Sequence, residues 1–347
     1  MIRFECDYAE GCHPAILEAL TQSNFEQHPG YGEDAHCDRA RQLIKEQLKA
    51  PEADVHFLVG GTQANATVIC AALRPHQGAV AAVTGHINVH ETGAIEALGH
   101  KVLPLPSDDG RISAEQVEEY CAAHYGDSTH EHMVQPGMVY ISQPTENGTL
   151  YTLEQLRAMR RVCDKYGMML YVDGARCGYG LASPANDVEL SDLAALCDVF
   201  YIGGTKVGAL FGEAVVITNE NLKKDFRYFI KRQGGMLAKG RLLGVQFETL
   251  MDGGLYQNLG KHAVSLALEI RKTFEDCGVS MLYDSPTNQQ FPILTRAERE
   301  AFSEKYAFSH WQNLEGDKAA VRFCTSWFTP EENVRLLMED IRRICKR

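Results

Sequence analysis

Basic residues are in the minority in this chain. Its 34 lysines and arginines are outnumbered by 46 aspartates and glutamates, so the formal net charge is −12. Such a balance repels nucleic acid and anionic membranes, and we expect neither as a partner. The sequence also lacks an apolar run of the ~20 residues that a membrane-spanning helix needs. Its first residues already carry charge at Arg3 and Glu5, unlike a signal peptide. The sequence therefore predicts a cytoplasmic protein.

Closely spaced cysteines are lacking too. The 11 cysteines are scattered and no two form a C-x-x-C pair, which argues against zinc and thioredoxin chemistry. We expect buried free thiols in a reducing compartment. The polar stretch 126–137 holds His130 and His132, and we interpret it as a solvated loop. The sequence predicts no metal site.

Two nucleotide-binding fingerprints are absent. No G-x-G-x-x-G follows a predicted strand, and no G-x-x-x-x-G-K-[ST] occurs anywhere in the chain. These absences argue against a dehydrogenase and against a P-loop enzyme.

Strands and helices alternate along most of the sequence. With 347 residues, 45% of them apolar and 23% charged, the chain is long enough to bury its own core. Apolar stretches typical of buried strands, such as 55–59, 169–172 and 199–202, alternate with helical patterns, one of them near 89–98. Repeated units of this kind predict an α/β fold with a mostly parallel sheet sandwiched by helices.

The pattern changes after about residue 218. Helical patterns cover 219–232, 239–252, 256–277 and 330–347, and strands are expected near 280–283, 289–294 and 320–324. We therefore predict a large domain over residues 15–250. A smaller α+β C-terminal domain would comprise residues 251–347 together with residues 1–14.

Three elements of the sequence carry chemistry. The stretch 60–65, Gly-Gly-Thr-Gln-Ala-Asn, follows a predicted strand and opens a helix, so its backbone N–H groups can approach an anion. The alternative is a plain turn with Thr62 as the helix cap. Asp173 and Lys206 each end a buried strand, at the sheet edge where ligands of open α/β sheets bind. A structural ion pair between them, or a surface lysine, is the alternative there.

One cofactor accounts for all three elements. Pyridoxal 5'-phosphate needs a lysine for a Schiff base, an acid for its pyridine nitrogen and a helix N-terminus for its phosphate. The acid keeps the ring nitrogen protonated, so that the ring can accept electrons from the α-carbon of a substrate. We therefore predict pyridoxal phosphate as the cofactor.

These residues resemble a known family, the threonine aldolases and β-eliminating lyases, which are pyridoxal-phosphate enzymes of fold type I with the aspartate-aminotransferase fold. The resemblance spans nearly the whole chain. Its most specific motifs are 61–65 (Gly-Thr-Gln-Ala-Asn), 172–176 (Val-Asp-Gly-Ala-Arg) and Thr205-Lys206. Weaker ones are 31–34 (Tyr-Gly-Glu-Asp), His86 with 91–93 (Glu-Thr-Gly), and Val321-Arg322.

The resemblance implies a role for each matched residue. Lys206 would form the Schiff base, Asp173 would face the ring nitrogen, and His86 would stack on the ring near the reacting carbon. The further implied cofactor contacts are Gly61, Thr62, Gln63, Arg176, Thr205 and Lys239, the last reaching the phosphate and supplied by this chain or a neighbouring subunit. The implied substrate contacts are Cys6, Tyr31, Arg176 and Arg322, with both arginines on the substrate carboxylate.

Departures from the family pattern lie on the substrate side. Cys6 stands where many threonine aldolases have a serine that touches the substrate carboxylate. Glu146 stands where the family has a histidine associated with the β-hydroxyl, and Val207 replaces a glycine after the lysine. Glu146, His86 or a bound water would act as the catalytic base. The alternative for Glu146 is a solvent-facing turn residue, since Asn147 and a glycine follow it.

The leading prediction is a pyridoxal-phosphate-dependent aldehyde-lyase, similar to threonine aldolase, that cleaves a β-hydroxy-α-amino acid to glycine and an aldehyde. One alternative is β-elimination from a cysteine-like or aromatic amino acid, and a transaminase or racemase is another. The non-enzyme alternative is a non-catalytic regulatory protein that binds an aldimine. The resemblance also implies a homodimer or homotetramer with shared active sites.

Overall fold

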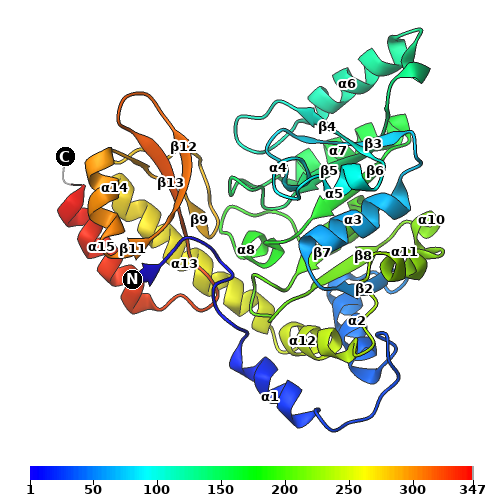
Figure 1. Ribbon diagram of the computed structural model, residues 1–347, viewed down its shortest axis with the longest axis horizontal. Coiled ribbons are helices and arrows are strands. Elements are labelled where there is room, and N and C mark those ends of the chain that lie inside the picture. The colour runs from blue at the N-terminus through cyan, green and yellow to red at the C-terminus, as the bar shows by residue number, and fades with distance from the viewer. Residues whose placement is uncertain (346–347) are drawn as a thin grey trace.

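A seven-stranded sheet forms the centre of the larger part of the molecule (Figure 1). The computed structural model describes residues 1–345. The strand order is β2-β8-β7-β6-β5-β3-β4, and only β8 runs against the others. The prediction of a mostly parallel sheet is therefore confirmed. Its strands are β2 (Asp54–Leu58), β3 (Gln77–Ala82), β4 (Lys101–Leu105), β5 (Gln135–Ser142), β6 (Met169–Asp173), β7 (Val199–Gly203) and β8 (Glu213–Ile217).

Helices cover both faces of this sheet, because its strands are apolar on both sides. Along β7, Val199 and Tyr201 pack into the core on one face, and Phe200 and Ile202 pack into the core on the other. The first face carries α3 (Gly61–Ala72), α5 (Ala94–Ala97), α10 (Glu220–Lys223) and α11 (Phe226–Arg232). The second carries α1 (Pro14–Gln22), α2 (Ala35–Leu48), α6 (Ala114–Gly126), α7 (Leu153–Tyr166), α8 (Cys177–Leu181), α9 (Leu190–Leu196) and α12 (Arg241–Met251).

The helix α7 shows how local sequence sets the boundaries of these elements. The Thr152 side chain accepts a hydrogen bond from the Gln155 N–H, and the Gln155 side chain accepts one from the Thr152 N–H. This reciprocal pair satisfies two N–H groups that a helix start leaves open. Gly167 ends the helix in the left-handed conformation at φ 65°. The threonine, the glutamine three residues later and the final glycine therefore set both ends of this helix.

The smaller part of the molecule is built around a second sheet and joins the two ends of the sequence (Figure 1). Strand β13 (Ala319–Cys324) pairs antiparallel with β9 (Gln289–Gln290), β10 (Ile293–Leu294) and β12 (Ser309–Asn313). Near them β1 (Ile2–Arg3) pairs parallel with β11 (Tyr306–Ala307). The helices here are α13 (Leu255–Asp276), α14 (Arg296–Ser303) and α15 (Glu331–Ile344). Strands and helices are thus both present, as the α+β prediction requires.

The long helix α13 runs from one part into the other. Tyr256 and Ala263, in its first half, pack into the core of the large sheet. Ile270 and Phe274, in its second half, pack into a separate core together with Phe4. Because one helix contributes to both cores, the predicted boundary between residues 250 and 251 stays a prediction.

Some predicted elements are corrected by the structure. The helix expected near 89–98 is two single turns, α4 (His86–Val89) and α5, because Thr92 and Gly93 adopt the left-handed conformation. The helix expected over 219–232 is divided into α10 and α11 at Asp225, at φ 62°. The strand expected near 280–283 is reduced to one bridge between Met281 and Pro292. The short helix η1 (His130–His132) lies in the expected loop.

The C-terminal helix α15 agrees with the predicted closing helix up to residue 344, and positions 346 and 347 lie outside the described residues. Across residues 1–345, none of the helices has both the length and the apolar character that crossing a bilayer requires.

Candidate active site

Asp173 is the last residue of β6 and is only 4% exposed. Its carboxylate accepts hydrogen bonds from the hydroxyls of Tyr140 (2.6 Å) and Tyr201 (2.5 Å). It also accepts from the side-chain amide of Asn65 (3.1 Å) and the backbone N–H of Ala175 (3.0 Å). Four donors satisfy a buried carboxylate. They also fix its orientation at the sheet edge where ligands of such folds bind.

His86 is connected to Asp173 through two buried side chains. His86 Nδ1 lies 2.7 Å from Glu91 Oε1, and Asn65 Nδ2 donates to the same oxygen at 2.6 Å. Asn65 Nδ2 also donates to Asp173. The bond to Glu91 holds the imidazole ring in place and leaves Nε2 for another partner.

Glu146 lies directly beside His86. Its Oε1 accepts hydrogen bonds from the Ser142 hydroxyl (2.7 Å) and from the backbone N–H of His86 (2.9 Å). Burial raises the pKa of the Glu146 carboxyl, and the charge of Asp173 raises it further. Burial opposes the charge of His86, but its hydrogen bond to Glu91 and the carboxylates around it raise its pKa above the ordinary value. Glu146 is therefore not a solvent-facing turn residue.

Lys206 lies in the connection between β7 and β8, next to the segment that follows β6. The Gly203 N–H donates to the Gly174 carbonyl at 3.0 Å. A Cβ atom on Gly174 would come within 1.8 Å of the Tyr201 carbonyl oxygen, so only glycine allows this approach. Lys206 Nζ lies 5.7 Å from the centre of the Tyr8 ring. The two segments that carry the predicted acid and the predicted lysine are thus brought together.

Thr205 is held by a buried glutamate. Its Oγ1 donates to Glu213 Oε1 (2.8 Å) and accepts from the Gly212 N–H (3.0 Å). The Gly204 N–H donates to Glu213 Oε2 at 3.1 Å. Burial raises the pKa of Glu213 to about 7, although the charge of Lys206 opposes this rise. Thr205 and Glu213 therefore fix the turn that carries Lys206, and a contact of Thr205 with the cofactor stays a prediction.

Arg176 is bound to a carboxylate of its own chain. Its Nε and Nη2 donate to the two oxygens of Asp7 at 2.7 and 2.9 Å, and Asn288 donates to the same carboxylate at 2.9 Å. Asp7 is fully buried, and burial acts to raise its pKa, but the charges of Arg176 and Lys206 outweigh this effect and lower it. This bidentate pair uses two of the three guanidinium nitrogens of Arg176.

Arg322 has only neutral partners. From β13, its Nη1 donates to Gln289 Oε1 (3.1 Å) and its Nη2 to the Glu5 carbonyl (3.0 Å). Its guanidinium carbon lies 5.2 Å from the centre of the Trp311 ring. Within residues 1–345 no carboxylate forms an ion pair with Arg322. Its positive charge is therefore available to an anionic ligand.

Cys6 lies between the residues that hold these two arginines. Glu5 supplies a carbonyl to Arg322, and Asp7 supplies its carboxylate to Arg176. The Cys6 side chain is half-buried, and burial raises the pKa of its thiol. Its predicted contact with a substrate carboxylate stays a prediction.

The first turn of α3 presents backbone N–H groups beside Asp173. The helix follows Gly60, and no side chain of residues 1–345 caps its first turn. A Cβ atom on Gly61 would lie 3.0 Å from the Tyr201 hydroxyl, which donates to Asp173. Thr62 is exposed, whereas the Gln63 side chain is engaged by the Val59 N–H and the Gln233 carbonyl. An uncapped helix start, a buried acid and a nearby lysine together fit pyridoxal phosphate.

Tyr31 and Lys239 lie together in another region of the chain. A Cβ atom on Gly240 would come within 2.5 Å of the Gly32 nitrogen, and the Tyr31 N–H donates to the Ala238 carbonyl at 3.3 Å. Tyr31 is 47% exposed, and the centre of its ring lies 5.0 Å from the amine of Lys231 on α11. Figure 1 shows α11 at one side of the large sheet and α8, which begins beside Arg176, at the side facing the smaller part. Among the described residues, the hydrogen bonds of Asp173 involve neither Tyr31 nor Lys239.

Four side chains of this site were missed by sequence reasoning. Asn65 and Glu91 lie in motifs that the sequence singles out, but their contacts with Asp173 and His86 depend on the folded chain. Asp7 follows Cys6 directly. Glu213 had a visible signal, because it is an acid at the start of the apolar stretch Glu-Ala-Val-Val-Ile.

The buried Glu213 leads to a prediction about pH. Its pKa is about 7 in the folded chain against an ordinary 4.5, so its contribution to stability is present below pH 4.5 and is lost as the pH rises toward 7. Glutamine mimics the protonated form and removes this dependence. We expect the cofactor-free Glu213→Gln variant to gain up to about 3 kcal/mol of unfolding free energy relative to wild type over this range.

Urea unfolding at pH 5 and pH 8 measures this difference. The matched control is Glu220→Gln, at an exposed position of α10, which should change stability equally at both pH values. An equal effect of Glu213→Gln at the two pH values would contradict the assigned shift.

Comparisons with known proteins agree with this arrangement. The family model described as "Beta-eliminating lyase" matches residues 6–312. The low specificity L-threonine aldolase of Pseudomonas sp. is 29% identical, over 99% of this chain and 97% of its own length. A solved threonine aldolase of Leishmania major is 43% identical, with a TM-score of 0.97, over 99% of this chain and 100% of that one. A Thermus thermophilus aspartate aminotransferase shares the fold alone, at 13% identity, a TM-score of 0.72 and coverage of 99% and 91%.

These matches confirm the predicted fold class, since threonine aldolase and aspartate aminotransferase are pyridoxal-phosphate enzymes of fold type I. They also confirm the predicted enzyme class, because the matched family consists of lyases. The family model covers most of the chain, and the similarity to threonine aldolases extends over nearly all of it. The chain belongs to the beta-eliminating lyase family.

Proposed function

We propose that this chain is a pyridoxal-phosphate-dependent aldolase that cleaves a β-hydroxy-α-amino acid of the threonine type to glycine and an aldehyde. The observation that carries the proposal is the pair formed by His86 and Glu146 at the edge of the sheet, beside Asp173. The raised pKa of the Glu146 carboxyl makes it a stronger proton acceptor than an ordinary glutamate. Such a pair is what removal of a β-hydroxyl proton requires.

The proposed cofactor site uses residues of the large sheet. The first turn of α3, with Gly61 and Thr62, would hold the phosphate, and Lys206 would supply the amine that attaches the cofactor. Asp173 would hold a proton on the ring nitrogen. When bound, pyridoxal phosphate supplies an electron sink for the bond that breaks at the α-carbon.

The two arginines have different parts in this proposal. The charge of Arg176 is already matched by Asp7, whereas Arg322 has no anionic partner among the described residues. Arg322 would therefore bind the substrate carboxylate, which suits a planar guanidinium. Arg176 would join the segment around Asp7 to the large sheet and would turn its remaining nitrogen toward the same ligand.

The products formed from one substrate test the proposal. Holoenzyme incubated with L-threonine should release glycine and acetaldehyde in equal amounts. β-Elimination from the same substrate would instead give ammonia and 2-oxobutanoate, and inversion at the α-carbon would give D-allothreonine. Either of these results, or no reaction across a panel of β-hydroxy-α-amino acids, would contradict the proposed cleavage.

Glu146 gives a sharper prediction about the substrate side. Glu146→Gln keeps an oxygen that can accept from Ser142 and from the His86 N–H, so the fold and the bound cofactor should persist. The kcat for cleavage should nevertheless fall by about ten- to ten-thousandfold, because an amide cannot take up the hydroxyl proton. Steady-state kinetics measure this loss, and the visible absorption of the bound cofactor should be unchanged.

Two further variants complete this experiment. Ser142→Ala keeps the carboxylate and removes only one of its donors, so its kcat should fall less than that of Glu146→Gln. Glu146→His should shift activity toward threonine relative to other β-hydroxy-α-amino acids. Wild-type kinetics of both position-146 variants on every tested amino acid would assign the base to His86 or to water.

We also propose an assembly with shared sites, a homodimer or homotetramer. The support for it is the joint position of Tyr31 and Lys239, which lie together and form no hydrogen bond with Asp173 among the described residues. In such an assembly this pair would reach the phosphate and substrate of a neighbouring subunit. The partner of the enzyme is a small amino acid, and a cytoplasmic location stays a prediction from composition.

A further inference from the structure

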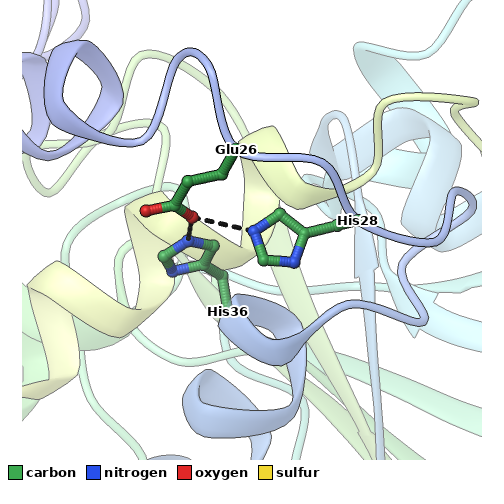
Figure 2. Close-up of side chains that lie close together, drawn as sticks. All are labelled: Glu26, His28 and His36. Carbon is green, nitrogen blue, oxygen red and sulfur yellow. Dashed lines mark hydrogen bonds and ion pairs between the residues drawn. The ribbon is translucent and has the colours of Figure 1, made fainter.

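Three potential metal ligands converge outside the catalytic region. Glu26 and His28 lie in the segment between α1 and α2, and His36 lies in the first turn of α2 (Figure 2). His28 Nε2 is 2.8 Å and His36 Nε2 is 3.0 Å from the same oxygen, Glu26 Oε2. The two imidazole rings have their centres 5.3 Å apart. One ligand atom from each residue lies within 4.8 Å of the others.

A fourth residue orients this cluster from behind. His36 Nδ1 lies 2.6 Å from Glu248 Oε2, on the neighbouring helix α12. When Glu248 accepts a hydrogen bond from Nδ1–H, the ring proton stays on Nδ1. The other ring nitrogen, Nε2, then carries a lone pair that can bind a metal ion. This is the arrangement in which histidines of metal sites are usually held. Glu248 binds Nδ1 of the His36 ring, whereas Glu26 binds Nε2 on the other side of the ring. The contact with Glu248 is therefore additional to the hydrogen bonds that hold the three residues of the cluster together.

The exposure of the ligands also suits an ion. The side chains of His28 and His36 are 19% and 22% exposed, and that of Glu26 is 48% exposed. The two imidazoles are thus largely enclosed, while the carboxylate borders solvent. A bound ion would keep one open position there for water. Three protein ligands plus water is a common set for zinc.

We propose that Glu26, His28 and His36 form a binding site for a divalent transition-metal ion of the zinc type. Two imidazoles and one carboxylate favour zinc or a similar ion over Mg²⁺ and Ca²⁺, which prefer oxygen ligands. Tetrahedral zinc places such ligand atoms about 3.3 Å apart. The two observed separations of 2.8 and 3.0 Å need to open only slightly.

The site would fasten the segment that follows α1 to the large sheet. Through His36 and Glu248 an ion would link this segment to α2 and α12. Tyr31 lies in the same segment, three residues after His28. The ion would be structural, because no ligand of the site contacts Asp173, His86 or Lys206 among the described residues. This site was missed by sequence reasoning, because the metal-binding patterns considered there were cysteine pairs and the histidines of the stretch 126–137.

Binding of zinc to the purified full-length holoenzyme tests the proposal. After treatment with a chelator, calorimetric titration with ZnCl₂ should show one tight site per chain, and thermal unfolding should shift upward with saturation. His28→Ala should lose both effects, and the contacts that it removes, with Glu26 and with the His36 ring, lie within the cluster itself. Glu248→Gln keeps all three ligands and should weaken binding by about 10- to 100-fold.

The matched control is the double variant His130→Ala/His132→Ala, which removes two histidines from η1 and leaves the cluster intact. It should bind zinc as wild type does. Visible absorption of the Co²⁺-loaded protein, compared between wild type and His28→Ala, reports ligation directly. The proposal is overturned if His28→Ala binds zinc as tightly as wild type, if the control loses the tight site, or if wild type has none.

Discussion

Replacing Lys206 with alanine should lower kcat for amino-acid cleavage by at least about 10⁴-fold, the scale seen when a group that bonds covalently is removed. The turn that carries Lys206 is fixed by Thr205 and Glu213, so the substitution should not disturb the fold. The visible absorption band of the Schiff base with Lys206 should disappear. Cofactor should still be retained on dialysis, because the first turn of α3 and Asp173 remain. Steady-state kinetics and absorption spectra measure these effects.

The position of attachment can be established chemically. Borohydride reduction of the holoenzyme followed by peptide mapping should find the mass of the cofactor on the peptide that contains Lys206. The matched control is Lys239→Ala, in which the mapped position should stay at Lys206. Finding the cofactor on Lys239 of the wild type, or on no lysine, would refute this assignment.

Asp173→Asn should also lower kcat strongly, by roughly 10²- to 10³-fold. An amide cannot hold a proton on the ring nitrogen of the cofactor. The fold should persist, but the free energy of unfolding should fall by about 1–3 kcal/mol. The reason is that each carboxylate oxygen of Asp173 accepts two donors, and the new NH₂ group would face at least one of them without an acceptor. Kinetics and urea unfolding measure the two effects separately.

Tyr140→Phe is the matched control for this variant. This variant loses the 2.6 Å hydrogen bond from the Tyr140 hydroxyl to Asp173, but it keeps the negative charge of the Asp173 carboxylate. Its kcat should therefore fall far less than that of Asp173→Asn. An unchanged kcat in Asp173→Asn would place the partner of the ring nitrogen elsewhere.

The fold class could be predicted from the sequence because it depends on local patterns. The strands β6 and β7 are short apolar stretches that end in glycine-containing turns. Asp173 is the last residue of β6, whereas Lys206 lies three residues beyond the end of β7 and not at the strand end that the sequence predicts. Their shared edge follows from the parallel arrangement alone. Conversely, the helix expected near 89–98 is wrong. The pattern of apolar residues gave no sign that Thr92 and Gly93 turn left-handed.

Much of the site could not be predicted, because its contacts join distant positions. The bond between Arg176 and Asp7 spans 169 residues, and that between His36 and Glu248 spans 212. No pattern within a window of sequence contains both members of such a pair. Gln63 shows a second reason why prediction from sequence is limited. Its motif indicates phosphate binding, but in the folded chain its side chain is held by Val59 and Gln233.

The pairing of β1 with β11 has a consequence for the order in which the chain can fold. Residues 2–3 precede every strand of the large sheet in the sequence, but their partners, Tyr306 and Ala307, follow all of those strands. The Ser309 hydroxyl that bonds to the Glu5 carbonyl lies 304 positions further along the chain. The large sheet can therefore form while residues 2–8 are still undocked. The contacts of β1 with β11 and of the Glu5 carbonyl with Arg322 can form only after the strands of the large sheet have been made, so the side of the site near Arg322 is completed after the side near Asp173.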